Sequence, residues 1–133
     1  MKLKVAMMAA LLLSQAVSAA PKALTFKNQR GSVLELNILA DNKIEGTFTT
    51  AVASKGCPQA VGKSRPIIGY LVGNAVSFSV VYPMCGSILS VTGNFDAKQT
   101  LIDTMSLLEH QATDIEHEGP GARFIGHDTY RKV

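Results

Sequence analysis

The sequence of 133 residues contains no tryptophan, only two cysteines and few charged residues. Charged side chains make up 17% of the chain, against about 25% in an average soluble domain. The formal net charge of +3 includes Lys2 and Lys4; without them, 11 basic residues oppose 10 acidic ones and the net charge is +1. No stretch interleaves basic with aromatic residues, so the composition argues against a nucleic-acid-binding protein.

The chain also lacks an apolar run of the roughly 20 residues that a transmembrane helix requires. Its longest apolar stretch, VAMMAALLL at 5–13, follows the basic start MKLK and precedes the small residues VSA at 17–19. This order is typical of a secretory signal peptide cleaved before Ala20. An N-terminal core helix is the alternative, but no cap or amphipathic pattern supports it. We predict a signal peptide at 1–19, one domain at 20–133 and a secreted or periplasmic protein.

Catalytic motifs are missing as well. The sequence has no nucleophile elbow, no HExxH and no phosphate-binding loop. His127 and Asp128 are adjacent, and because neighbours on a strand face opposite sides, they cannot share one pocket. His110 and His117 are expected to be exposed, and no base is identifiable beside Ser106. We therefore predict that the protein is not an enzyme and has no cofactor or metal.

The two cysteines, Cys57 and Cys85, both lie in the part of the chain that follows the predicted signal peptide. In an oxidising compartment such a pair is most simply a disulfide, worth about 3.5 kcal/mol in the chain-entropy model. A metal site built on two thiolates is the alternative. No histidine or further cysteine lies at ligand spacing beside either of them, which favours the disulfide.

The rest of the chain is predicted to form about eight strands, at 24–28, 32–39, 44–52, 66–72, 75–82, 87–95, 100–108 and 122–130. Short turn sequences, ADNK, GN and DAKQ, separate several of them, and 109–121 reads as a polar loop. Regular spacing without helical periodicity predicts an up-and-down barrel or a sandwich. We expect an all-β, eight-stranded antiparallel barrel.

Alternation along these strands predicts inward-facing rows that are apolar at one end. The pattern is broken near strand ends by Ser32, Thr50, Tyr82, Ser106 and Asp128, and Asn28 has the same parity. Polar residues that converge at one mouth of a barrel are suited to a small-molecule site. The alternative is that the hydroxyls bond neighbouring backbone and that Asp128 is solvated.

Several segments, taken in order, resemble the avidin family from about residue 26 to the end. They are FKNQRGSVLEL, NKIEGTFTTAV, VSFSVVY, IDTMSLL and IGHDTYRKV. The positions of Cys57 and Cys85, the Cys-x-Ser sequence and the Gly-Pro-Gly at 119–121 resemble the short dimeric bacterial avidins such as rhizavidin. The resemblance implies an avidin-like barrel that binds biotin, as a ligand and not as a cofactor, in its mouth.

Carried over position by position, the resemblance assigns a polar cluster to the ureido group of the ligand. Asn28 and Ser32 match donors to the ureido oxygen, while Thr50 and Asp128 match acceptors of the two ureido N–H groups. Ser87 matches a residue near the carboxylate of the biotin side chain. The implied ligand-binding set is Asn28, Ser32, Phe48, Thr50, Tyr82, Ser87, Leu89, Ser106, Leu108 and Asp128.

Departures from the family pattern lie mainly around the ring of the ligand. Phe48 replaces a tyrosine, Leu89 a threonine and Arg30 an apolar residue, and the tryptophan box maps onto Tyr82, Val91, Ser106 and Pro120. Because truncating a packed ring typically costs about 3–5 kcal/mol, we expect weakened biotin binding. A different small cyclic ligand, such as another urea, an amide or a peptide group, is one alternative. An oligomeric scaffold with a degenerate pocket is the other. Arg30 could pair with a ligand carboxylate or be an exposed loop residue.

The resemblance also implies a homodimer or a higher homo-oligomer, because barrels of this family pack through their outer faces. Alternation places four apolar residues outward: Val81, Met105, Leu107 and Ile125. Scattered apolar residues are ordinary on any protein surface, so this pattern is compatible with an interface without requiring one. The expected partners are a small molecule and further copies of the chain, with neither nucleic acid nor membrane.

Overall fold

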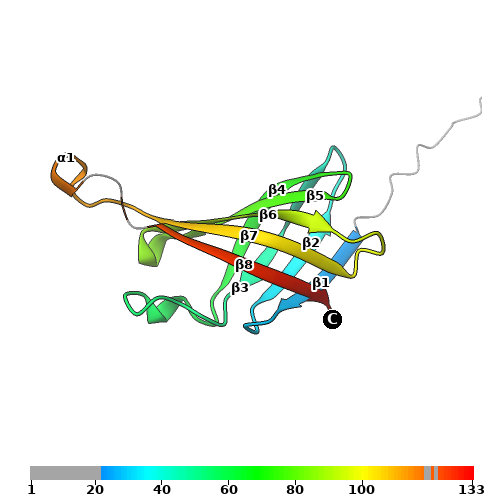
Figure 1. Cartoon of the computed structure of the whole chain (residues 1–133), viewed down its shortest axis with the longest axis horizontal. Coiled ribbons are helices and arrows are strands. Elements are labelled where there is room, and N and C mark those ends of the chain that lie inside the picture. Colours follow the sequence, from blue (N-terminus) through cyan, green and yellow to red (C-terminus); the bar gives the residue numbers. More distant parts are fainter. Residues whose placement is uncertain (1–21, 119–120, 122) are drawn as a thin grey trace, which may run out of the picture.

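A computed structural model describes residues 22–118, 121 and 123–133, in which eight antiparallel strands form one closed barrel (Figure 1). The predicted barrel is confirmed, and the sandwich is excluded. The predicted signal peptide at 1–19 lies outside the described residues. The strands are β1 (Lys22–Asn28), β2 (Val33–Ile38), β3 (Lys43–Thr49), β4 (Ser64–Val72), β5 (Ala75–Tyr82), β6 (Ser87–Phe95), β7 (Leu101–His110) and β8 (Arg123–Lys132).

Each strand pairs with its sequence neighbours, and the turns that join them have the predicted chemistry. Asp41 and Asn42 occupy the β2–β3 turn with φ of 60° and 59°, a region that these two residue types tolerate. Gly73 opens the two-residue β4–β5 turn with φ of 59°. Its missing Cβ permits that conformation, which matches the twist of the strands it joins.

Pairing of β1 with β8 closes the barrel, with Asn28 opposite Tyr130. The inward rows of the strands fill one end with an apolar core that includes Leu24, Leu36, Ile44, Phe78, Phe95 and Ile102. At the other end the inward residues become polar, and Asn28, Ser32, Thr50 and Asp128 are all buried there. Alternation predicted these faces because side chains on a strand point to opposite sides in turn.

Two inward assignments are only partly correct, and one loop contains more structure than predicted. Val52 is 44% exposed and Phe124 is 54% exposed, because both lie at the rim of the barrel. β7 continues to His110, and the segment between β7 and β8 includes a short helix, α1 (Ile115–Glu118). Figure 1 shows this hairpin extending well beyond the barrel, with α1 near its tip.

Two 3-10 turns, η1 (Pro58–Ala60) and η2 (Pro83–Cys85), lie at the same end as the buried polar residues and are joined by the Cys57–Cys85 disulfide. The predicted disulfide is confirmed, which removes the two-thiolate metal site. Among the described residues, no group of three His, Cys, Asp or Glu side chains is placed to hold a metal ion. No helix within the described part of the chain is long and apolar enough to cross a membrane.

Candidate functional site

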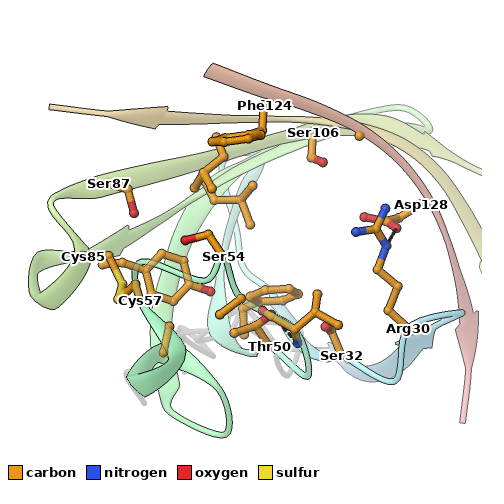
Figure 2. A pocket seen from close by; sticks show the side chains of 18 of the residues that line it. Arg30, Ser32, Thr50, Ser54, Cys57, Cys85, Ser87, Ser106, Phe124 and Asp128 are labelled. Atoms are coloured by element: carbon orange, nitrogen blue, oxygen red, sulfur yellow. Dashed lines mark hydrogen bonds and ion pairs between the residues drawn. A yellow bond between two sulfur atoms is a disulfide. The ribbon is translucent and has the colours of Figure 1, made fainter. Parts of the chain in front are cut away.

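The polar end of the barrel contains a cavity of about 430 Å³, within the range of small-molecule sites. Every residue of the sequence-predicted set lies on its wall: Asn28, Ser32, Phe48, Thr50, Tyr82, Ser87, Leu89, Ser106, Leu108 and Asp128. The cavity has two ends (Figure 2). The polar end comprises Asn28, Ser32, Thr50 and Asp128. The disulfide end comprises Cys57, Tyr82, Cys85, Ser87 and Leu89.

At the polar end, Asn28 and Ser32 are fixed by backbone groups of the β1–β2 turn and the segment after β3. Asn28 Oδ1 accepts from the backbone N–H groups of Arg30 at 3.1 Å and Ser32 at 2.9 Å. Ser32 Oγ accepts from the Ala51 N–H at 2.9 Å. Because that oxygen is already an acceptor, the Ser32 hydroxyl hydrogen is available to a ligand. The Asn28 amide uses one N–H for Tyr130 and keeps its second N–H as a donor.

Thr50 has the complementary arrangement just after β3. Its hydroxyl donates to the Val52 carbonyl at 2.5 Å, and its oxygen accepts from the Val52 N–H at 3.2 Å. The hydroxyl hydrogen is therefore engaged, and the remaining lone pair can only accept. The predicted alternative, that these hydroxyls bond neighbouring backbone, is correct for both Ser32 and Thr50. It does not oppose a ligand role, because the backbone bonds fix which groups remain free.

Asp128 is buried on β8 and has protein partners of its own. Gln29 Nε2 donates to Asp128 Oδ1 at 2.8 Å, and Arg30 Nε lies 3.2 Å from the same oxygen. Gln29 also accepts from the Thr129 N–H at 3.0 Å, which fixes its amide. Figure 2 shows the Arg30 side chain reaching from the β1–β2 turn to this carboxylate. Arg30 thus pairs with Asp128 Oδ1, and the second carboxylate oxygen remains for a ligand.

Tyr130 lies at the polar end of the cavity and Tyr82 at the disulfide end. Burial is the largest influence on the pKa of both phenols. Burial and the negative charge of Asp128 raise the pKa of Tyr130, while a hydrogen bond from Asn28 acts in the opposite direction. Burial raises the pKa of Tyr82 to about 12, and the positive charge of Arg65 opposes that shift. Both phenols therefore stay protonated across the physiological pH range.

The wall between the two ends comes from β7 and β8. Ser106 faces Gly126 across the pair, and a Cβ on Gly126 would lie 2.9 Å from Ser106 Oγ. His110 packs edge-on against Phe124, with ring centroids 5.8 Å apart. Both rings line the cavity. The exposed position expected for His110 is wrong, because β7 runs past the barrel and carries this residue to the cavity rim.

Sequence reasoning missed the segment after β3 and the disulfide as parts of the cavity wall. Ala53, Ser54 and Ala60 lie on that wall together with the two cysteines. The only signal was the disulfide itself, which ties this segment to the end of β5. Of the positions matched to the tryptophan box, Val91 is buried in the core and absent from the cavity wall. Pro120 lies outside the described residues.

Outside the barrel, His127 contacts Asp103 on the outer surface, while Asp128 points inward. The prediction that adjacent His127 and Asp128 face opposite sides is confirmed. The cavity thus contains donors and acceptors fixed by the backbone and a single carboxylate paired with an arginine.

Comparison with known proteins gives consistent results. The family model described as "Avidin family" matches residues 19–133. The bradavidin2–biotin complex is similar with a TM-score of 0.66 and 26% identity, over 86% of this chain and 99% of that chain. The short afifavidin–biotin complex has a TM-score of 0.68 and 27% identity, over 84% of this chain and 88% of that chain. The rhizavidin–biotin complex has a TM-score of 0.68 over 84% of this chain and 92% of that chain. Its sequence identity is 21%, so this similarity shows the fold alone. No curated protein matches.

Proposed function

Because this chain belongs to the avidin family, we propose that it binds a small cyclic urea, with biotin as the leading candidate, in the cavity of its barrel. The match of the free groups at the polar end to a urea carries this proposal. A cyclic urea has one carbonyl oxygen that accepts and two N–H groups that donate. The polar end has two free donors, on Asn28 and Ser32, and two free acceptors, on Thr50 and Asp128.

Binding without chemistry is the mode that this arrangement supports. Asp128 is acceptor-only when ionised, so it suits an N–H group, and a charge-assisted hydrogen bond of this kind is stronger than a neutral one. Solved avidins of similar sequence were crystallised with biotin, namely bradavidin2 and short afifavidin.

We expect the affinity for biotin to be weaker than a site lined by tryptophans would give. The wall beyond the polar end carries Tyr82, Ser106 and Leu89, and the whole sequence lacks tryptophan. A serine such as Ser106 covers far less of a ligand ring than an indole would, because an aromatic side chain itself buries about 150–250 Å². Losses at neighbouring positions do not simply add, so this argument sets the direction and not the affinity.

Titration calorimetry of the oxidised protein with biotin tests the proposal. Asp128→Asn keeps the size of the side chain but removes the charge, and it should lower the affinity by tenfold or more, since hydrogen bonds to charged groups contribute about 1.5–3 kcal/mol. Asp41→Asn, a matched change in the exposed β2–β3 turn, is the control and should bind as the unmodified protein does. No heat and no thermal shift with saturating biotin would eliminate biotin as the ligand.

An oligomer is a second part of the proposal, supported by the outer face of β5–β8. Val81 pairs with Ile88 and Leu107 with Ile125 across adjacent strands. These residues and Met105 are 41–76% exposed, so they form one apolar surface on the single chain. We expect a homodimer through this face. Light scattering should show a mass of twice the chain that falls to one on Leu107→Glu, while Val61→Glu, elsewhere on the surface, should leave the dimer intact.

If biotin fails to bind while the dimer persists, the scaffold alternative is favoured.

Export is the remaining part of the proposal, and the Cys57–Cys85 disulfide supports it because such bonds persist in oxidising compartments. Mass spectrometry of the protein recovered outside the cytoplasm should find an N-terminus at Ala20. Recovery of the full chain from the cytoplasm with both thiols reduced would contradict export.

A further inference from the structure

The Tyr82 hydroxyl has no protein partner. Tyr82 ends β5 and is only 4% exposed, and its Oη is the one buried side-chain polar atom among the described residues without a hydrogen bond. A buried hydroxyl normally has a partner, because leaving it unpaired forfeits its bonds to water. The hydrogen bonds of the polar end make the contrast clear, since Asn28, Ser32, Thr50 and Asp128 are all bonded within the protein.

Tyr82 lies on the cavity wall, with its Oη just covered by neighbouring atoms. A small turn of the ring would bring the hydroxyl to a ligand, which could then supply the missing partner. The neighbour of Tyr82 across the β5–β6 pair is Ser87, which is also buried and also lines the cavity. Leu89, the next inward residue on β6, is apolar and offers no hydrogen bond. The phenol keeps its proton at ordinary pH, so Tyr82 offers the ligand a hydrogen-bond donor.

We propose that Tyr82 is a specificity-determining residue, and that the cavity takes a cyclic urea whose far side carries a second hydrogen-bond acceptor. This inference rests on the proposed function, because the urea at the polar end fixes which part of the ligand reaches Tyr82. In biotin the sulfur lies in the second ring, on the side away from the urea carbonyl. That ring therefore extends from the polar end toward the disulfide end.

The oxidation state of that sulfur offers a direct probe. A thioether sulfur is a weak acceptor, whereas a sulfoxide oxygen is a strong one. Biotin and biotin sulfoxide share the urea, the rings and the side chain, so they differ mainly in the group presented to Tyr82. The sulfoxide should bind the unmodified protein about tenfold more tightly than biotin, as expected for satisfying a buried donor.

The experiment compares both probes by calorimetry on the unmodified protein, Tyr82→Phe and Tyr70→Phe. Tyr82→Phe removes only the hydroxyl, so it should abolish the preference for the sulfoxide. Tyr70→Phe removes a hydroxyl that is exposed on the outer face of β4, and it should keep the preference. A sulfoxide that binds no better than biotin, or a preference that survives Tyr82→Phe, overturns the inference and leaves urea binding intact.

Thermal unfolding without ligand provides a test that does not depend on binding. If the hydroxyl lacks a partner, Tyr82→Phe should be at least as stable as the unmodified protein. A clear fall in Tm would mean that an internal water already bonds the hydroxyl, which contradicts the inference. Failure of both probes to bind any of the three proteins would overturn the proposed function and this inference together.

Discussion

The two ends of the cavity are built in opposite ways. At the polar end, backbone and side-chain partners fix each polar side chain before any ligand arrives, as Ser32 Oγ with Ala51 and Asp128 with Gln29 show. At the disulfide end, a covalent bond holds the wall, and the Tyr82 hydroxyl has no partner. A preorganised end loses little freedom when a ligand binds, so it can set orientation, whereas we expect the other end to determine which ligand is preferred.

Removing the disulfide should give the largest effect and should damage one end only. Cys57 and Cys85 are 28 residues apart, so the double change Cys57→Ser and Cys85→Ser should lower the free energy of unfolding by about 3.5 kcal/mol. Denaturant unfolding measures this loss. Amide exchange should rise in the segment 51–63, while β1 and β8 stay protected. An equal loss of amide protection at both ends of the cavity would show that the disulfide supports the polar end as well.

Alkaline unfolding compares the two tyrosines. Their pKa values are raised in the fold, so between pH 10 and 12 the unfolded chain loses phenolic protons that the folded chain keeps, and stability falls as pH rises. Both Tyr82→Phe and Tyr130→Phe should make this fall less steep. At neutral pH only Tyr130→Phe should lower the free energy of unfolding, because the Tyr130 hydroxyl has a hydrogen bond with Asn28 whereas the Tyr82 hydroxyl has no partner. Equal destabilisation by the two changes would show that Tyr82 has a partner.

Adding a ring to the wall should sharpen the contrast between the ends. Ser106→Trp places an indole at a position that lines the cavity, opposite Gly126, which has no side chain to obstruct the ring. Covering apolar ligand surface in this way should raise biotin affinity about tenfold in calorimetry. Ser64→Trp, at the exposed start of β4, is the control. An unchanged affinity would mean that this wall does not contact the ligand.

The smallest effect is expected from Arg30→Leu at the polar end. Arg30 is half-exposed, with 49% of its side chain accessible, so its pair with Asp128 should contribute at most about 1 kcal/mol. Without it, Asp128 lacks one partner in the free protein and gains more from a ligand N–H. Biotin affinity should rise by up to about fivefold, and its dependence on salt should weaken. A fall in affinity would instead make Arg30 a direct contact of the ligand.

Sequence patterning predicted the eight strands, their inward faces and the disulfide. It was less successful at the cavity rim. Alternation placed Phe124 inward and Phe124 does line the cavity, but this rim residue also meets solvent. His110 was misplaced because β7 continues beyond the barrel. Alternation picked out six of the ten candidate site residues, the resemblance supplied the other four, and the fold brought all ten to one cavity. Their role toward a ligand stays a prediction.

The sequence by itself determined what depends on nearby residues. A period of two sets which side chains face inward, turn residues permit the tight hairpins, and the only two cysteines can form just one disulfide. Only the tertiary structure decided which groups meet across long separations. Gln29 and Asp128 are 99 residues apart, yet closure of β1 against β8 brings them within 2.8 Å. The unpaired hydroxyl of Tyr82 is equally a property of the closed barrel, because an unpaired group is defined by every neighbour that surrounds it.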